Sequence, residues 1–364
     1  MAENKRRFAV LTGGGDCPGL NAVIRAVIKT FLQNDCEVYG IYNGFNGLIN
    51  GNLKLMNYAD VSGILPRGGT ILGTTNRDNP FKFAVEENGE LVYYDMRDKV
   101  VENLQKHNIE ALVVIGGDGS LNIGAKLARE CGIKVVGVPK TIDNDLPCTE
   151  RTFGFDTAVA CATEAVDRLH TTAESHHRVM ALEVMGRYAG WIALYSGIAG
   201  GADVILLPEI PYDINSVIEK IEHRRKNGKN FSIVVVAEGA KPIGGELSVA
   251  RVVKGSFEPI RLGGAGERLV REIEERTGIE SRCTVLGYLQ RGGSPSSYDR
   301  ILSTRYGVAA AEACLRGEFN VMVSLENDQI VTVYIQKAAS SPRLVPVDSE
   351  IIRTGRQIGI CFGD

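Results

Sequence analysis

Short runs of β-branched and other apolar residues alternate along the chain with stretches of helical periodicity. The first run, "FAVLT" (8–12), is followed by "AVIRAVIKTFL" (22–32), where Val23, Ala26, Val27 and Phe31 fall on one helical face. Such alternation favours parallel strands joined by right-handed helical crossovers. We therefore expect doubly wound α/β layers with binding sites at the carboxyl ends of the strands. Further expected strands are "EVYGIY" (37–42), "ALVVIG" (111–116), "IKVVGV" (133–138), "VMALEVM" (179–185), "FSIVVVAEG" (231–239), "CTVLGYL" (283–289) and "NVMVSL" (320–325).

The length of the chain sets the expected number of domains. Its 364 residues suggest two domains, since a domain commonly has about 100–200 residues. The fold class that we expect is α/β, with two doubly wound, Rossmann-like domains and a cleft between them. The longest irregular stretch, residues 241–264, reads as a surface insertion or flap.

Charge and cysteine content narrow the classes of function. The formal net charge is −3, so no broad basic field points to nucleic acid, and any anion site must be local. The eight cysteines include no C-x-x-C pair and no zinc-like spacing with histidine. With no signal peptide recognised, they are typical of reduced thiols and predict a cytoplasmic protein. No apolar run approaches the ~18 residues that a membrane span needs.

The glycines are clustered rather than spread. "LTGGGDCPGLNAVIRAV" (11–27) predicts a strand, a glycine turn and a helix. Glycine lets a ligand approach the backbone, and a helix N-terminus offers free N–H groups to phosphate. The segment matches neither G-x-x-x-x-G-K-[ST] nor G-x-G-x-x-G, so phosphate binding and an ordinary tight turn both remain open here.

The segment "VVIGGDGSLNIGAKLA" (113–128) has the same strand, turn and helix pattern, with Asp118 in the turn. An acid there can cap the helix by accepting N–H bonds from Ser120 or Leu121. Alternatively, Asp118 holds Mg²⁺, which in turn bridges phosphate oxygens. A carboxylate beside phosphate is unfavourable without a cation between them, so the two interpretations differ in whether a metal is needed.

The segment "VPKTIDNDLPCTERTFGFDTA" (138–158) places Thr141, Asp143 and Asp145 directly after a strand. Two acids two residues apart can be simple turn residues. They can also divide the work, one accepting a proton from an attacking hydroxyl and the other lying nearer a metal. Together with Lys140 and Mg²⁺, such acids would form a phosphoryl-transfer centre based on positioning and charge.

Arginines flank two of the expected strands. Arg178 and Arg187 lie at opposite ends of one, and Arg282 and Arg291 lie at the ends of another. Surface arginines are usually only solvated. Arginines beside buried strands and Gly-Gly turns, however, are well placed to bind phosphate by paired hydrogen bonds.

Taken together, these segments resemble the 6-phosphofructokinases of the bacterial-type superfamily. The matching stretches, which occur in the family's order from position 13 to 295, are "GGGDCPGLNAVIR", "RGGTILGTTNR", "IGGDGSLNIGA", "PKTIDND", "EVMGR", "AEG" and "LGYLQRGGSP". The resemblance implies Mg²⁺-dependent phosphoryl transfer to O1 of fructose 6-phosphate. It also implies a donor domain of residues 1–156 with 296–342, and a sugar-phosphate domain of residues 157–295 with 343–364.

The resemblance also implies a role for each matching residue. Asp143 is the base for the 1-hydroxyl proton, Thr141 helps hold the transferring phosphoryl group, Asp145 lies close by, and Asp118 is the magnesium-associated acid. Arg77 and Arg187 offset charge in the transition state. The donor-binding residues would be Gly14, Gly15, Phe45, Arg77, Gly117, Asp118, Gly119 and Ser120. The sugar-phosphate pocket would comprise Thr141, Asp143, Met185, Gly186, Arg187, Glu238, Tyr288 and Arg291, with Arg178 and Arg282 supplied by a neighbouring subunit.

Three positions depart from the pattern of short ATP-using members. Tyr288 stands where His is common, and Phe45 stands where Tyr is common near the adenine. Tyr288 can still donate a hydrogen bond and Phe45 can still stack. Lys140 resembles pyrophosphate-using members, which read P-K-T-I-D-N-D and also G-G-D-D, whereas Gly119 resembles ATP-using ones.

We expect Gly119 to decide the phosphoryl donor. An aspartate at position 119 would fill the space for an α-phosphate and repel it, whereas Lys140 helps either donor. The sequence therefore predicts ATP, with pyrophosphate as the alternative. More distant alternatives are a lipid or NAD kinase, since such kinases share a G-G-D-G turn, and a non-catalytic regulatory subunit.

The resemblance finally predicts a homo-oligomer, dimer or tetramer, with shared active sites. Arg25, Lys29 and Lys229 resemble parts of an effector pocket at a subunit interface. A solvated helix face explains such basic residues equally well, so the sequence leaves allosteric control open.

Overall fold

The computed structural model describes residues 5–252, 260–338 and 341–364. The first half of the fold is a seven-stranded sheet of order β15-β14-β7-β6-β1-β2-β3. Its five central strands run parallel, and the edge strands β3 and β15 pair antiparallel to their neighbours. The strands are β1 (Arg7–Thr12), β2 (Glu37–Ile41), β3 (Leu53–Leu55), β6 (Ala111–Gly116), β7 (Val135–Pro139), β14 (Val321–Glu326) and β15 (Gln329–Tyr334).

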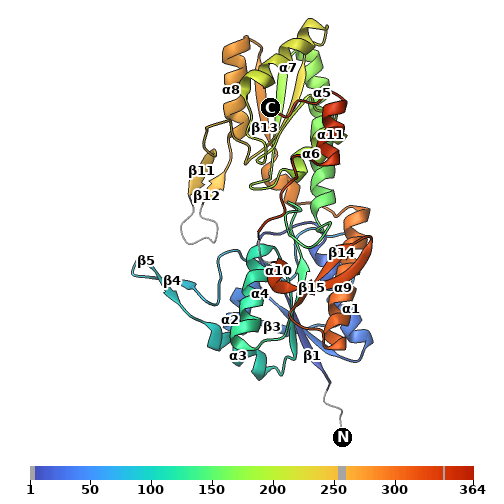
Figure 1. Cartoon of the computed structure of the whole chain (residues 1–364). Helices are drawn as coiled ribbons and strands as arrows, with labels where there is room; N and C mark the ends of the chain where they lie inside the picture. The colour runs from blue at the N-terminus through green and yellow to red at the C-terminus, as the bar shows by residue number, and fades with distance from the viewer. Residues whose placement is uncertain (1–4, 253–259, 339–340) are drawn as a thin grey trace.

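Helices cover both faces of this sheet (Figure 1). Val23, Val27 and Phe31 of α1 are fully buried, so the apolar face expected from the periodicity is the one that packs on the sheet. Helix α9 packs beside α1 on that face, and α2, α3 and α4 lie on the other. The helices are α1 (Leu20–Gln33), α2 (Gly44–Asn50), α3 (Arg97–Lys106), α4 (Asp118–Cys131), α9 (Ser297–Arg316) and α10 (Ile335–Ala338).

The second half is a four-stranded parallel sheet of order β13-β8-β10-β9. Cys361, near the end of the chain, pairs with Val204 of β9. The strands are β8 (Val179–Val184), β9 (Val204–Leu206), β10 (Ser232–Ala237) and β13 (Ser281–Val285). The helices around them are α5 (Phe155–His176), α6 (Trp191–Ala199), α7 (Ile214–Lys226), α8 (Ala265–Thr277) and α11 (Glu350–Gln357).

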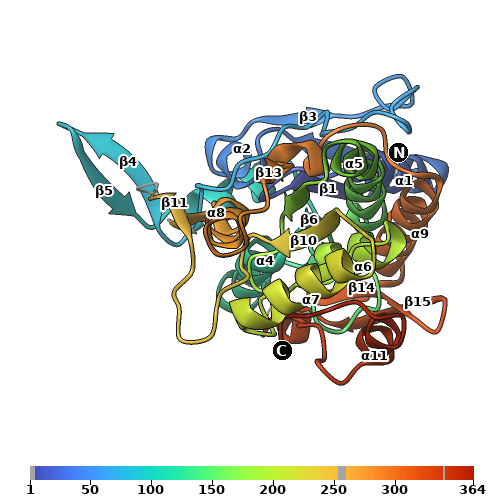
Figure 2. The same cartoon turned by 90° about the horizontal axis from the view of Figure 1, so that it is seen from above.

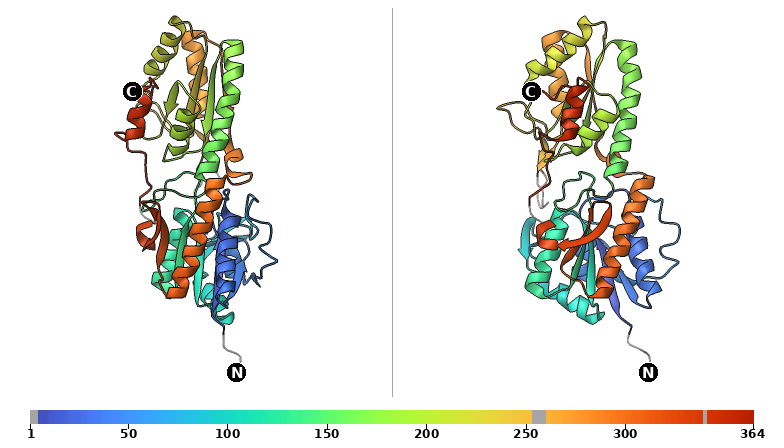
Figure 3. Two further views of the ribbon diagram at one scale, coloured as in Figure 1. Left: turned by 90° about the vertical axis from the view of Figure 1, so that its right-hand side faces the viewer. Right: turned by 45° about the vertical axis from the view of Figure 1, so that its right-hand side comes forward.

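The two halves are stacked end to end (Figure 3). One continuous hydrophobic cluster includes Val23 of α1 and Leu182 of β8, so packing extends through both sheets. The expected α/β class with two layered sheets is confirmed. The exact domain boundaries given above stay a prediction. In the parts of the chain that the structure describes, no helix is long and apolar enough to cross a membrane.

Two hairpins project from the same side of the molecule (Figures 1 and 2). One joins β4 (Phe83–Glu87) to β5 (Glu90–Tyr94) through Asn88 and Gly89, which both have positive φ. That Asn-Gly turn matches the twist of a two-residue hairpin, and the dipeptide is a sequence signal for one that our expected strands did not include. The other pairs β11 (Val249–Val252) with β12 (Ile260–Leu262), so the expected irregular flap at 241–264 contains a short sheet. Its residues 253–259 lie outside the described part of the chain.

One expected strand is wrong in its second half. "CTVLGYL" does not continue as a strand, because β13 ends at Val285 and a 3₁₀ helix, η1 (Gly287–Arg291), follows. Gly287 has φ +51°, a left-handed conformation that ends an extended strand. The chain therefore leaves the sheet at Gly287, and Tyr288 and Arg291 lie in η1 rather than in a strand.

Candidate active site

The site begins where β1 and β6 end side by side. The Gly13 N–H donates to the carbonyl of Ile115 (2.9 Å), which joins the two glycine turns. A Cβ on Gly13 would lie 2.5 Å from the Ser120 Oγ, and Gly14 has φ +80°. Side chains are therefore disfavoured at Gly13 and Gly14, whose N–H groups are both donated to backbone carbonyls. A turn without side chains lets a ligand such as phosphate approach the backbone closely, and we call this turn and the segments that surround it the cradle.

Helix α4 supplies the second part of this cradle. Its N-cap is Gly117 and Asp118 is its first residue, so Asp118 does not cap the helix, contrary to the first of our two interpretations. Asp118 and Gly119 are exposed. A Cβ built on Gly119 meets no atom within 4 Å. The space beside Gly119 is therefore open, as expected from the sequence.

A loop after β3 closes the cradle on a third side. The Gly14 N–H donates to the Thr75 carbonyl (3.0 Å), and the Thr74 hydroxyl donates to the Gly14 carbonyl (2.7 Å). This pairing holds the loop against the glycine turn, and the exposed Arg77 follows Thr75 by two residues. Phe45, at the start of α2, is 3% exposed and packs in the core of the first sheet. The structure thus places the Phe45 ring below the cradle, with little free face for stacking.

Lys140 lies under the cradle rather than on its surface. Its side chain is buried, and its Nζ donates to the Gly15 carbonyl (2.6 Å). Burial lowers the pKa of Lys140, while the carboxylates of Asp118 and Asp143 oppose that shift. The lysine therefore joins the end of β7 to the 13–15 turn.

The acids predicted from "TIDND" share a tight loop after β7. The Asp143 N–H donates to the Thr141 Oγ1 (3.1 Å). Asn144 has φ +52°, and its buried Oδ1 accepts from the Thr152 N–H (2.9 Å), which pins the turn. Burial raises the pKa of Asp145, and the nearby Asp143 and Asp118 carboxylates raise it further. The structure thus brings these carboxylates together.

The second sheet provides the facing wall. Met185, Gly186 and Arg187 follow β8, and Glu238 follows β10. The Gly239 N–H donates to the Gly186 carbonyl (3.2 Å), which holds the two strand ends in register. Gly186 has φ +140°, and a Cβ there would lie 2.8 Å from the Ala189 carbonyl oxygen, so this turn requires glycine.

Arg291 connects the two walls. It is the last residue of η1, and its Nη1 donates to the Asp16 carbonyl (3.3 Å), beside the first glycine turn. The buried Gln290 accepts from the Met185 N–H (3.3 Å), so η1 is fixed to the end of β8. The cation of Arg291 therefore lies between the donor cradle and the β8 turn.

Three predicted residues do not join this cluster within one chain. Arg178 precedes β8 and Arg282 lies at the start of β13, at the opposite edge of the sheet from Met185. Both arginines pair with Glu280, at 2.8 Å and 2.6 Å. Tyr288 points outward and is 68% exposed. These positions leave all three accessible to another copy of the chain.

Glu183 is a buried acid beside the site that the sequence did not lead us to expect. It lies in β8, is 2% exposed, and accepts from the backbone N–H groups of Gly264 (3.2 Å) and Gly266 (2.8 Å). It therefore holds the N-terminus of α8, where a carboxylate is favoured by the helix dipole. The signal was an acid within the apolar run "VMALEVM", because a charge in a buried strand needs a partner.

The pKa of the Glu238 carboxyl is raised by its surroundings. Burial raises its pKa to about 7, the carboxylates of Asp143 and Glu183 add to the shift, and Arg291 opposes it. A carboxyl whose pKa is higher folded than unfolded (about 4.3) binds more protons in the folded state. The stability that it contributes is complete below pH 4.3 and is lost as the pH rises through about 7.

We expect Glu238→Gln, which stays neutral, to be more stable than the wild type at pH 8. The free energy of unfolding should be higher by about 1–3 kcal/mol there, and the difference should shrink as the pH falls to 4.5. Urea unfolding at several pH values measures this. Glu86→Gln on the exposed β4 strand is the matched control and should show no such trend. A difference independent of pH would contradict the expectation.

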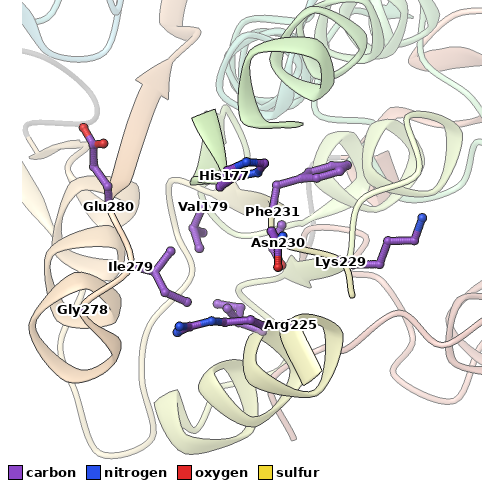
Figure 4. Close-up of a pocket in the computed structure, with 11 residues that line it drawn as sticks. His177, Val179, Arg225, Lys229, Asn230, Phe231, Gly278, Ile279 and Glu280 are labelled. Atoms are coloured by element: carbon purple, nitrogen blue, oxygen red, sulfur yellow. The ribbon is translucent and has the colours of Figure 1, made fainter. Parts of the chain in front are cut away.

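A separate pocket lies at the amino ends of β8 and β10. Its volume is about 330 Å³, and Figure 4 shows Arg225 reaching toward Ile279 while Lys229 points away from them. Arg25 and Lys29 lie on α1, in the other half of the molecule. One chain therefore does not bring the three basic residues of the expected effector site together. The pocket is lined by His177, Val179, Ile221, Arg225, Lys229, Asn230, Phe231, Ser232, Gly278, Ile279 and Glu280.

The acids of the cradle fit a magnesium ion that is shared with a ligand. Oxygen ligands suit Mg²⁺, which is commonly held by one or two carboxylates together with phosphate oxygens and water. Among the described residues, no three His, Cys, Asp or Glu side chains are grouped to hold a metal by themselves. Asp118 is exposed at the edge of the cradle, and its charge reaches Asp145. A cation there would relieve the repulsion between these acids.

Comparison with known proteins agrees with this geometry. The family model described as phosphofructokinase matches residues 7–314. ATP-dependent 6-phosphofructokinase 2 of Clostridium perfringens is 54% identical, with 100% of both chains covered. The pyrophosphate–fructose 6-phosphate 1-phosphotransferase of Amycolatopsis mediterranei is 51% identical over 94% of this chain and 97% of that protein.

Among solved structures, the phosphofructokinase of Pichia pastoris in the T-state superposes with a TM-score of 0.79 and 33% identity. The match covers 93% of this chain but 36% of the yeast chain, so this protein spans about a third of that length. The glycine turns, the "TIDND" loop and the arginine-bearing wall thus lie in a chain that belongs to the phosphofructokinase family.

Proposed function

We propose that this protein is an ATP-dependent 6-phosphofructokinase, which transfers the γ-phosphoryl group of ATP to O1 of fructose 6-phosphate. The proposal is supported by family membership and by the two facing walls of the site. One wall has glycine turns and cations suited to a polyphosphate, and the other has Arg291, Glu238 and the β8 turn. Family membership argues against the lipid-kinase and NAD-kinase alternatives. We also propose a cytoplasmic location.

The open space at Gly119 is the observation that carries the choice of ATP. Similar relatives bear ATP-dependent and pyrophosphate-dependent names at nearly equal identity, so their names alone do not choose the donor. Apart from its own turn of α4, no part of the structure lies within 4 Å of a Cβ at position 119, which is exposed. Compared with pyrophosphate, ATP has one more phosphate and a nucleoside to place, and this space is available for them.

In the proposed reaction, Asp143 accepts the proton of the 1-hydroxyl as O1 attacks the γ-phosphorus. The bond between that phosphorus and the bridging oxygen of ADP breaks, so ADP leaves with the electron pair. Thr141 binds the transferring group, while Arg77 and Arg187 offset the charge that spreads over its oxygens. Magnesium, held by Asp118 and phosphate oxygens, would supply further charge neutralisation.

The sugar-phosphate side of the proposal requires a second subunit. Glu238, Met185, Gly186 and Arg291 would bind the sugar, with Tyr288 at the rim. Arg178 and Arg282 lie at the other edge of the sheet, so they can serve only the site of a neighbouring copy. We therefore propose a homodimer or homotetramer whose active sites are shared.

Mixing two inactive variants tests the shared site. Asp143→Ser keeps both arginines, and the double variant Arg178→Ala/Arg282→Ala keeps the base. After partial dissociation and reassociation, some sites should combine an intact base with intact arginines, so activity should rise well above that of either variant. Each variant treated alone is the control. A mixture no more active than the sum of its parts would exclude shared sites.

Pyrophosphate is the second candidate donor, supported by the pyrophosphate-dependent name of a relative that is 51% identical. The buried ammonium group of Lys140 lies against the Gly15 carbonyl at 2.6 Å, close to where a donor phosphate would bind. Its charge helps either donor, because both present phosphate oxygens at the cradle. Only a repulsive group at position 119 would discriminate against ATP, and that position carries no side chain.

A coupled assay decides the donor. Fructose 1,6-bisphosphate formation is measured with fructose 6-phosphate and Mg²⁺, first with ATP and then with pyrophosphate, and a reaction without metal is the control. We expect turnover with ATP that is lost when Mg²⁺ is chelated. Turnover with pyrophosphate alone would overturn the choice of ATP. No turnover with either donor would overturn the proposed function.

A further inference from the structure

A short segment near the C-terminus links the two walls of the site. Residues 341–349 run from the first half of the molecule up to α11 in the second (Figure 3). Within this segment Arg343 is half-buried and Val345 is buried, although their neighbours are exposed. These two inward-facing residues join the segment to both walls of the site.

Arg343 contacts the loop that carries Asp143. Its backbone N–H donates to the Asp145 carbonyl (2.7 Å). Its guanidinium Nη1 donates to the carbonyl of Asn144 (3.2 Å) and to that of Glu150 (3.1 Å). Three backbone carbonyls within residues 144–150 thus accept hydrogen bonds from one arginine. Two of them belong to the two residues that follow Asp143.

The same segment contacts the turn that follows Met185, Gly186 and Arg187. The Trp191 indole N–H donates to the Arg343 carbonyl (2.9 Å), and the Arg343 guanidinium lies 4.4 Å from the centre of the Trp191 ring. Glu209 accepts from the Val345 N–H (2.8 Å) and from the Gly190 N–H (3.0 Å). Trp191 and Gly190 stand at the start of α6, directly after the turn.

We propose that Arg343 is a positioning residue that fixes the Asp143 loop relative to the sugar-phosphate wall. It touches neither the reacting atoms nor the expected substrates. It joins the residues beside the proposed base to the helix that begins behind the β8 turn. Its separation of about 200 positions from Asp143 means that only the fold brings the two together.

The physical reason is the precision that phosphoryl transfer needs. The proton acceptor and the sugar come from different sheets, so their distance depends on how the two halves of the molecule are held. A displacement of about 1 Å in such a pair can lower a rate about 100-fold without weakening binding. Removing the guanidinium should therefore reduce kcat more than it changes KM. This inference rests on the proposed function.

The test compares Arg343→Met, which keeps the length of the side chain, with Arg343→Lys, which keeps its charge. We expect Arg343→Met to lower kcat about 10- to 100-fold per folded molecule, with KM for ATP and fructose 6-phosphate changed less than threefold. Arg343→Lys should recover part of the loss, because its ammonium can still donate to a carbonyl. Arg305→Met is the matched control, since Arg305 pairs with the exposed Asp328 (2.9 Å) and should keep wild-type rates.

A double variant separates positioning from general stability. Trp191→Phe removes the N–H that donates to the Arg343 carbonyl but keeps a ring beside the guanidinium, whereas Trp191→Leu removes both. The further loss of kcat from Trp191→Phe to Trp191→Leu should appear when Arg343 is present and be largely absent in Arg343→Met, where the guanidinium is already missing. Additive losses, wild-type kcat in Arg343→Met, or a loss confined to KM would overturn the proposal. An inactive wild type would instead overturn the proposed function, so the two failures are distinct.

Discussion

Asp143→Ser is expected to lower kcat by about three orders of magnitude while leaving fructose 6-phosphate binding nearly unchanged. The substitution removes the group that we propose as acceptor of the 1-hydroxyl proton. Serine at this position keeps the backbone N–H that donates to Thr141, and the buried Asn144 that pins the turn is untouched. The loop should therefore keep its shape, and the loss should fall on the chemical step.

Steady-state kinetics with ATP measures kcat, and calorimetric titration with fructose 6-phosphate measures binding. Asp167→Ser is the control, because Asp167 is an exposed acid on α5 and its replacement changes net charge by the same amount. Wild-type turnover in Asp143→Ser would reject the assignment of the base. Equal losses of binding and kcat would show instead that Asp143 acts mainly by holding the sugar.

Gly119→Asp is expected to reduce kcat/KM for ATP by roughly 10²- to 10³-fold. Two unit charges about 4 Å apart near a protein surface repel by about 4 kcal/mol, and partial screening reduces this to about 3–4 kcal/mol. The new side chain should not disturb folding, since a Cβ at position 119 meets no atom within 4 Å and Gly119 is not among the residues with positive φ. The loss should therefore come from repulsion of the nucleotide.

Two neighbouring substitutions separate charge from size. Gly119→Ala adds only a methyl group, and Gly119→Asn has the shape of aspartate without its charge. We expect alanine to keep most of the ATP activity, asparagine to lose part of it and aspartate to lose the most, with KM for fructose 6-phosphate unchanged in all three. Unchanged ATP kinetics in Gly119→Asp would reject Gly119 as the residue that decides the donor.

The proposed donor side of the site is built from signals that are local in the sequence. Each glycine turn lies between a strand and a helix that are adjacent in the chain, and β1, β6 and β7 are neighbours in one parallel sheet. Strand ends in such a sheet meet at one edge, so it could be anticipated that Gly13 and Asp118 lie near each other. The sequence also resembles a known family from position 13 to position 295.

The sequence was less informative where direction or burial depends on distant neighbours. Tyr288 was expected in the sugar pocket, but the left-handed Gly287 ends β13 early and leaves Tyr288 68% exposed in one chain. Phe45 was expected beside an adenine, but it packs in the core at 3% exposure. Tyrosine and phenylalanine side chains occur both in ligand pockets and elsewhere in a fold. The packing of distant segments around them therefore determines where each one lies.

The amino-acid sequence by itself determined the alternation of strands and helices, the glycine turns and the acids that follow β6 and β7. These features follow from periodicity and from the backbone freedom of glycine, which act over a few residues. The tertiary structure alone decided that Lys140 lies beneath the Gly15 carbonyl, that Glu183 holds the N-terminus of α8, and that Arg343 joins the Asp143 loop to α6. Each of these contacts links segments at least about 80 residues apart, and no local pattern encodes which of many buried polar groups will meet once the two sheets pack.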